Sequence, residues 1–240
     1  LEKLVRRARH IEVQDLGDQQ GNLVHLFERD CTVQRRNQKV VERAPAFFLK
    51  DSERETICDA ALRLCRGVGS YNAGTVEFLQ DTDSGEFYFI EVNPRIQVEH
   101  TVTELVTGID LIAAQLRIAS GEPLWLKQRD IRNQGHAIEC RINAEDPYND
   151  FAPSPGTIDM WYAPGGKGVR VDTHVYSGYT VPPYYDSMIA KLIVTAARRD
   201  VAIARMRRAL SEFIIRGIET TIPFQQVVIN HPDFIAGQYD

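Results

Sequence analysis

The sequence predicts an α+β fold of antiparallel hairpins with helices packed against them, and three observations predict it. Apolar and polar residues alternate through 9–29 and again through 74–93, and each segment contains a polar turn. Apolar residues recur at helical spacing in 52–68 and 200–212. Hydrophobic residues make up 43% of the 240 residues and charged residues 25%, which is typical of a globular chain and excludes disorder.

The first elements follow from these patterns in order along the chain. The hairpin 9–29 turns at 18–22, and a stretch rich in Arg, Gln and Lys follows it. We expect Ser52 to cap the helix 52–68, because Glu55 stands three residues later as a capping-box partner.

The second half of the chain is predicted as a separate unit. After the hairpin 74–93, residues 109–119 are expected to be helical. The strand 136–143 then begins the second unit, and Pro- and Gly-rich stretches and the helix 200–212 follow it. We therefore place a domain boundary between residues 130 and 131.

The hairpin 74–93 places two glutamates opposite each other. If its turn is centred on Ser84, Glu77 faces Glu91, and the two Cβ atoms are about 4.5–5.5 Å apart. Asn93 lies on the same face as Glu91, because side chains alternate along a strand. Two such carboxylates repel each other unless a cation lies between them, and oxygen ligands suit Mg²⁺ or Mn²⁺. The pattern indicates a divalent-metal site, and the alternative is two solvated glutamates on an exposed face.

The segment after this hairpin continues to alternate, so Arg95, Gln97 and Glu99 are expected to project together with Asn93. A guanidinium, an amide and a carboxylate beside a metal can hold a small planar anion, and the carboxylate can act as a base. The alternative is a solvated edge strand.

Two further sets of charged residues can be interpreted either as functional or as ordinary surface residues. The basic stretch 34–39 fits contact with polyphosphate, or it is a solvated face. Arg141 projects opposite to the apolar residues of the strand 136–143, and it points either into a cleft or into solvent.

Several function classes receive no support. A net charge of −5 gives none to nucleic-acid binding, and no apolar run approaches the ~18–20 residues of a membrane span. The four cysteines form neither CxxC pairs nor a disulfide framework, so we expect reduced thiols in the cytoplasm or an organelle matrix. The Gly-rich segment 165–168 lacks the strand–loop–helix context of a phosphate-binding loop.

Three stretches of the sequence resemble the biotin carboxylase family. They run from Glu28 to Glu42, from Phe89 to His100 (FIEVNPRIQVEH) and from Glu139 to Pro147 (ECRINAEDP), and the similarity extends along essentially the whole chain. The resemblance implies an ATP-grasp fold, with its C-terminal half in residues 1–130 and the biotin carboxylase C-terminal domain in 131–240. It also implies ATP-dependent carboxylation of biotin by bicarbonate.

The resemblance further implies a role for each site residue. Glu77, Glu91 and Asn93 are the implied ligands of Mg²⁺ or Mn²⁺. Glu99 is the implied base that deprotonates bicarbonate, and Arg141 stabilises the charge of carboxyphosphate and of the biotin enolate. The implied bicarbonate site comprises Lys39, Arg95, Gln97 and the backbone of Val98. The implied nucleotide contacts are Glu2, Lys3, Val5, His10, Gln34 and Asn37. Asn37 stands where many family members have histidine.

The same resemblance implies partners and leaves alternatives. The chain contains no Ala-Met-Lys-Met signal, so biotin is expected on a biotin carboxyl carrier domain. A carboxyltransferase, as a domain or as a separate polypeptide, would pass the carboxyl group to acetyl-CoA, another acyl-CoA or pyruvate, and a homodimer is expected through the C-terminal domain.

The family's glycine-rich lid is not among the 240 residues, so we expect this chain alone to be inactive. The alternatives are an inactive fragment and another ATP-grasp ligase, such as a carbamoyl-phosphate synthetase relative.

Overall fold

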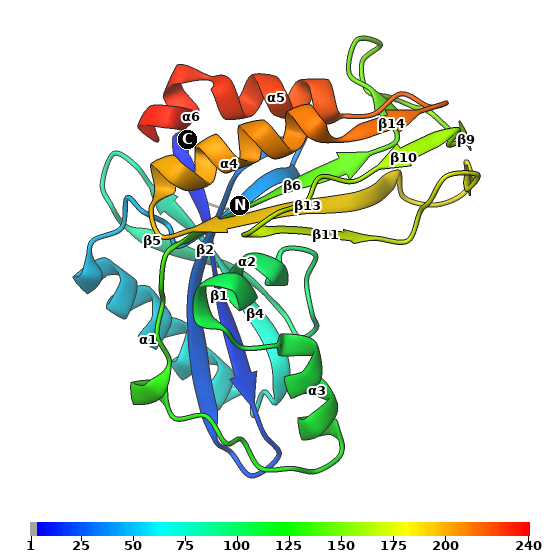
Figure 1. Ribbon diagram of the computed structural model, residues 1–240. Helices are drawn as coiled ribbons and strands as arrows, with labels where there is room; N and C mark the ends of the chain where they lie inside the picture. Colours follow the sequence, from blue (N-terminus) through cyan, green and yellow to red (C-terminus); the bar gives the residue numbers. More distant parts are fainter. Residues whose placement is uncertain (1–3) are drawn as a thin grey trace. The chain divides into compact units, whose positions relative to one another are not determined.

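The structure, a computed structural model, describes residues 4–240 and divides into two compact units (Figure 1). The first unit runs to Ala137 and also includes Tyr239 and Asp240, and the second unit is Ile138–Gln238. Among the described residues, no helix has both the length and the apolar character needed to cross a membrane.

The first unit is an antiparallel sheet with helices on its faces, so the predicted α+β class is confirmed. Its strands neighbour one another in the order β3-β2-β1-β4-β5. The strands are β1 (Ala8–Gly17), β2 (Leu23–Arg35), β3 (Gln38–Ala44), β4 (Asn72–Asp81) and β5 (Phe87–Asn93). The helices are α1 (Asp51–Gly67), α2 (His100–Thr107), α3 (Leu111–Ala119) and the short 3₁₀ helix η1 (Gln128–Asp130).

Different helices cover the two faces of this sheet. Alternation along β1 sends Ile11 and Val13 to the face under α1, where they pack with Ile57. Leu16 faces the opposite side and packs with Leu111 of α3. Figure 1 shows α1 and α3 on opposite sides of β1, β2 and β4. The sheet is therefore buried on both faces over much of its area.

The prediction of Ser52 as the cap of α1 is wrong. Lys50 is the N-cap residue, and its backbone N–H donates to the Glu53 carboxylate at 2.8 Å. Ser52 already lies inside the first turn, where its carbonyl accepts from the hydroxyl of Thr56. The helix uses the earlier of two acidic residues, Glu53 rather than Glu55, for its capping box.

The basic stretch 34–39, for which no element was predicted, forms the end of β2, a turn at Arg36 and Asn37, and the start of β3. The segment 94–99 is irregular rather than an alternating edge strand, and it leads into α2. Pro94 explains this ending of β5, because proline lacks the backbone N–H that a ladder hydrogen bond needs.

The second unit combines a longer set of strands with several short ones. The order β11-β13-β6 forms its main sheet, and α4 buries Ala202, Ile203 and Met206 on its apolar side. The predicted helix 200–212 is thus confirmed. The strands are β6 (His136–Asn143), β7 (Glu145–Asp146), β8 (Ala152–Pro153), β9 (Gly156–Thr157), β10 (Met160–Tyr162), β11 (Val169–Thr173), β12 (Thr180–Val181), β13 (Met188–Ala196) and β14 (Ile214–Arg216). The helices are α4 (Arg199–Glu212), α5 (Ile222–Asn230) and α6 (Pro232–Ala236).

Candidate active site

The face of the first-unit sheet opposite α1 carries a buried polar cluster. His10, Glu12 and Gln14 occupy the positions of β1 that alternate with Ile11 and Val13. Glu12 and Gln14 are fully buried. A buried carboxylate is costly unless it is paired or hydrogen-bonded, so the neighbours of Glu12 define the site.

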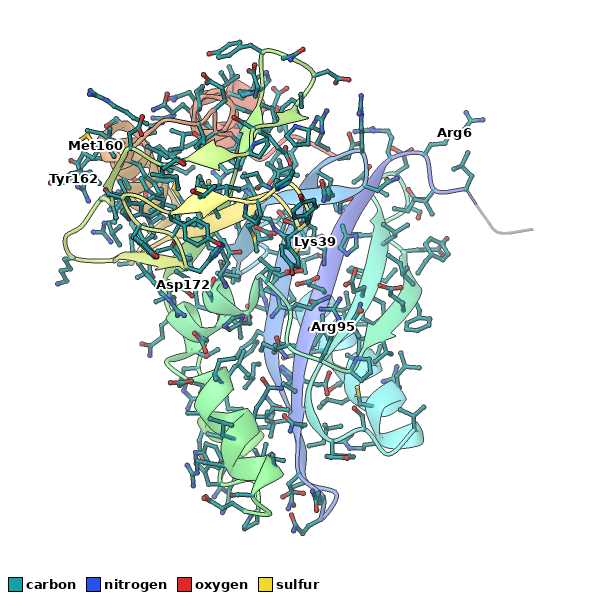
Figure 2. All side chains as sticks on the ribbon, turned by 90° about the vertical axis from the view of Figure 1, so that its right-hand side faces the viewer. Arg6, Lys39, Arg95, Met160, Tyr162 and Asp172 are labelled. Carbon is teal, nitrogen blue, oxygen red and sulfur yellow. The ribbon has the colours of Figure 1, made fainter. Side chains whose placement is uncertain are left out.

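Lys39 of β3 is the cation at the centre of this cluster. Its Nζ donates to carboxylate oxygens of Glu12 at 2.5 Å, Glu99 at 2.6 Å and Glu77 at 3.2 Å. Burial alone lowers the pKa of a lysine, but the surrounding carboxylates outweigh it and raise the pKa of Lys39 well above its usual range. Figure 2 labels Lys39 and Arg95, two of the predicted anion-binding residues.

Two of these carboxylates are held in the ionised form. Burial opposes the charge of Glu12, yet Arg29 and Lys39 lower its pKa to about 2. Burial likewise opposes the charge of Glu77, but the hydrogen bond to His10 and the charge of Lys39 lower its pKa to about 2. The distance from His10 Nε2 to Glu77 Oε2 is 2.6 Å. The cluster therefore keeps negative charge in a largely dry environment at neutral pH.

The predicted metal ligands lie together. Glu77 and Glu91 are direct partners in the β4–β5 register, as predicted. The Asn93 amide donates to Glu77 Oε1 at 3.0 Å and to Glu91 Oε1 at 2.9 Å, so it links the two carboxylates. Three side chains that bear hard oxygen donors thus converge, and this donor set fits Mg²⁺ or Mn²⁺.

The predicted anion-binding residues join the same network, although their backbone is not a strand. The Gln97 amide donates to Glu77 Oε1 at 2.6 Å, and Glu99 accepts from Lys39. Arg95 is exposed and donates to Asn93 Oδ1 at 3.3 Å. Gln97 and Glu99 are buried, with the backbone of Val98 between them.

The remaining predicted residues lie in several places. Glu2 and Lys3 are outside the described residues, and Val5 precedes β1. Gln34 donates to the Cys31 carbonyl at 2.9 Å. Asn37 is an exposed turn residue. Arg141 lies on β6 of the second unit, where its carbonyl accepts from the side chain of Gln225 at 2.8 Å. His10 contacts the predicted metal ligand Glu77.

Sequence reasoning missed three residues of this cluster, Glu12, Gln14 and Arg29. All three are fully buried, and Arg29 Nε lies 2.5 Å from Glu12 Oε1. The polar–apolar alternation of β1 was visible in the sequence, but it fits a solvent-facing side equally well. Only burial of both faces distinguishes the two cases.

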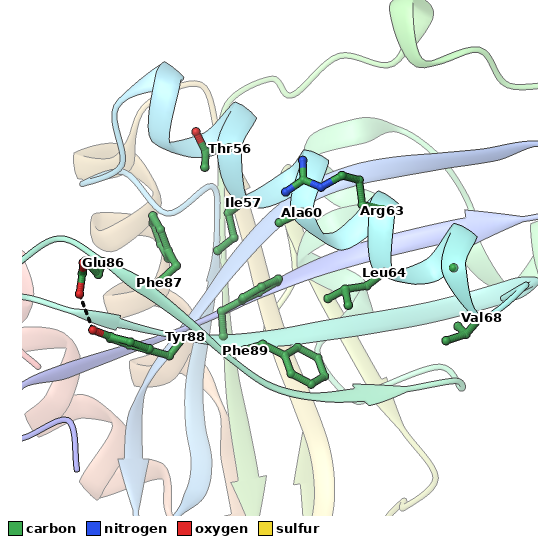
Figure 3. A pocket seen from close by; sticks show the side chains of 12 residues that line it. Thr56, Ile57, Ala60, Arg63, Leu64, Val68, Glu86, Phe87, Tyr88 and Phe89 are labelled. Atoms are coloured by element: carbon green, nitrogen blue, oxygen red, sulfur yellow. Dashed lines mark hydrogen bonds between the residues drawn. The ribbon is translucent and has the colours of Figure 1, made fainter. Parts of the chain in front are cut away.

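A separate hollow lies between α1 and β5 (Figure 3) and has a volume of about 870 Å³. Apolar side chains dominate it, including Ile57, Leu64, Phe78 and Phe89. None of the predicted site residues lines this hollow. The candidate site is therefore the polar cluster on the other face of the sheet, and this hollow is distinct from it.

Comparison with known proteins matches the two parts of the chain to two different family models. Residues 1–127 match the family model described as "Carbamoyl-phosphate synthase L chain, ATP binding domain". Residues 139–240 match the model described as "Biotin carboxylase C-terminal domain".

The known proteins that are similar to this chain are longer than it is. Biotin carboxylase 1 of Bacillus subtilis is 55% identical over all of this chain and 53% of its own length. The biotin carboxylase of Haemophilus influenzae is 55% identical over 99% of this chain and 52% of its own length. The biotin carboxylase domain dimer of Hydrogenobacter thermophilus 2-oxoglutarate carboxylase, solved with MgADP, ADP and bicarbonate, superposes with a TM-score of 0.97 at 51% identity, covering 99% of this chain and 52% of that one. The chain thus spans about half the length of these relatives.

Proposed function

Because the chain belongs to the biotin carboxylase family, we propose that it forms part of an enzyme that carboxylates biotin with ATP and bicarbonate. The observation that carries this proposal is the Lys39–Glu99 pair, 2.6 Å long, in the same network as the Glu77, Glu91 and Asn93 oxygens. An anion site, a base and a metal-ligand set are thereby within reach of one another. We assign residues 1–130 to the nucleotide-binding part and 131–240 to the C-terminal domain.

Glu77, Glu91 and Asn93 are the residues that would hold a divalent metal ion. When bound, the ion neutralises charge on the phosphates of ATP. His10 and Gln97 donate hydrogen bonds to Glu77 and fix the orientation of its carboxylate. Val5, Gln34 and Asn37, with Glu2 and Lys3, stay predictions as contacts of the nucleotide.

The first chemical step is assigned to Glu99. Its carboxylate accepts the proton of bicarbonate, a bicarbonate oxygen attacks the γ-phosphorus of ATP, and the bond from that phosphorus to the ADP oxygen breaks. Carboxyphosphate and ADP are the products. Lys39, Arg95 and Gln97 hold the anion and offset the charge that develops in the transition state.

The second step transfers the carboxyl group to biotin. Carboxyphosphate decomposes into CO₂ and phosphate, the released phosphate accepts the proton of the biotin ureido nitrogen, and that nitrogen bonds to the CO₂ carbon. Arg141 is assigned to stabilise the negative charge of the biotin enolate. Biotin arrives on a carrier domain, and a carboxyltransferase passes the carboxyl group on.

We propose a homodimer formed through the C-terminal domain, in the cytoplasm or an organelle matrix.

The test is the substrate dependence of ADP formation by the full-length protein with Mg²⁺ and ATP. We expect ADP formation to require bicarbonate and to accelerate when free biotin is added. Since residues 1–127 match a model named for carbamoyl-phosphate synthase, ammonia is the informative alternative substrate. Acceleration by ammonia and not by biotin would assign the protein to that ligase class and refute the proposal.

A further inference from the structure

Arg29 of β2 is a fully buried arginine whose five N–H groups all have acceptors. Its Nε donates to Glu12 Oε1 at 2.5 Å. Its Nη1 donates to Gln14 Oε1 at 2.7 Å and to the Thr103 hydroxyl at 2.9 Å. Its Nη2 donates to the Thr75 hydroxyl and to Gln97 Oε1, both at 3.1 Å. These acceptors come from β1, β4, α2 and the segment before α2.

Two of the five acceptors reach directly into the candidate site. Glu12 uses one carboxylate oxygen for Arg29 and the other for Lys39. Gln97 uses its amide oxygen for Arg29, so its amide nitrogen is directed at Glu77, which it meets at 2.6 Å. Arg29 therefore determines which end of the Gln97 amide faces the site, and it anchors the carboxylate that holds Lys39.

We propose that Arg29 is a positioning residue for the anion-binding half of the site, Lys39 and Gln97. This rests on the proposed function, in which these two residues hold bicarbonate. The guanidinium touches neither substrate nor metal, and it acts through Glu12 and Gln97. Lysine cannot replace it, because an ammonium has three donors and no planar fork.

The chain offers a matched control in Arg43 of β3. Arg43 is also almost fully buried, pairs with the buried carboxylate of Asp30 and lies beside the ring of Tyr239. Replacing it removes a buried arginine of the same sheet, and its ion pair with Asp30 includes no predicted site residue. The comparison separates loss of positioning from general loss of stability.

The experiment measures kcat, and KM for bicarbonate and for ATP separately, in the full-length Arg29→Lys and Arg43→Lys variants. Misplaced binding groups cost up to about 100-fold. We expect Arg29→Lys to raise the bicarbonate KM by about 10- to 100-fold, with a much smaller rise in the ATP KM because Gln97 also donates to the proposed metal ligand Glu77. Arg43→Lys should leave both KM values unchanged, although its melting temperature falls.

A second variant keeps the proposal testable if Arg29→Lys does not fold. Thr103→Val removes one acceptor of Arg29 and keeps the arginine, so we expect the bicarbonate KM to rise in the same direction by a smaller factor. An unchanged bicarbonate KM in the folded variants refutes the positioning role of Arg29 and leaves the proposed function standing. An equal rise in the KM values for bicarbonate and for ATP has the same consequence. A wild-type enzyme whose ADP formation ignores bicarbonate refutes the proposed function itself.

Discussion

Asp15 is a buried carboxyl that the candidate site does not use. It lies on β1 opposite Gly74 of β4 and beside Cys65 of α1. The Cys65 thiol is a hydrogen-bonding neighbour of this carboxyl group, but its effect on the pKa of Asp15 is smaller than that of burial. Burial raises the pKa of Asp15 from 3.8 to about 6, because the charged form loses its hydration. The folded protein therefore keeps Asp15 protonated up to a pH of about 6, well above the pH at which an exposed aspartic acid ionises.

This residue should make stability depend on pH. Burial of this acid does not lower the free energy of unfolding below the pKa of the unfolded state. It lowers that free energy fully above the pKa of the folded state, so stability is lost as pH rises. The variant Asp15→Asn cannot ionise. Its advantage over wild type in free energy of unfolding should grow by about 2 kcal/mol between pH 4 and pH 8. Urea unfolding at both pH values measures this, and Asp59→Asn, at an exposed position of α1, is the control. An advantage that is the same at both pH values contradicts the explanation.

Residues differ in how far the sequence could place them. The predicted pairing of Glu77 with Glu91 is confirmed, although the β4–β5 register shifts by one residue between Glu77 and Phe78, so the turn alone does not fix it. Glu12 and Arg29 could not be recognised, because their partners Gln97 and Lys39 are far away in the sequence. No local pattern distinguishes a buried polar face of a strand from a solvated one.

At the scale of elements, the turn between β2 and β3 controls where Lys39 lies. Arg36 and Asn37 have φ values of 49° and 63°, in the left-handed region. These two residues close a two-residue hairpin that pairs Gln34 with Lys39. Asparagine tolerates this conformation better than most residues, and glycine adopts it freely. The backbone of the turn is therefore sufficient to explain an asparagine at position 37.

Substitutions at position 37 test that explanation. We expect Asn37→Gly to keep the free energy of unfolding near that of wild type. Asn37→Val should lower it by about 1–2 kcal/mol, because a β-branched residue is strained at positive φ. Thermal or urea unfolding of both variants checks this. Equal stability of the glycine and valine variants would show that the backbone conformation does not select the residue.

Elements with strong periodicity could be predicted, whereas those shaped by tertiary contacts could not. The hairpins and the helix Arg199–Glu212 follow from alternation and helical spacing. The β2–β3 hairpin was missed because residues 34–39 are all polar, so they show no apolar–polar alternation. The segment 94–99 was predicted as a strand but is irregular, because Pro94 ends the β5 ladder. Its polar side chains nevertheless join the same hydrogen-bond network.

At the scale of the whole molecule, the chain contains the residues proposed to bind the metal ion and the anion, and it spans about half the length of its relatives. We therefore expect the 240-residue chain to form no ADP in response to bicarbonate and biotin, while the full-length protein does. Parallel assays at equal concentration measure this. Biotin-stimulated turnover by the short chain would contradict the expectation.

The most direct test of the central claim is the Glu99→Gln variant of the full-length protein. This change keeps the size of the side chain and removes its ability to accept the bicarbonate proton. Glu122→Gln, which alters a half-exposed partner of Arg117, is the matched control. We expect Glu99→Gln to abolish the bicarbonate-dependent, biotin-stimulated formation of ADP, and Glu122→Gln to retain it. Undiminished biotin-stimulated turnover in Glu99→Gln would contradict the assignment of Glu99 as the base and the mechanism built on it.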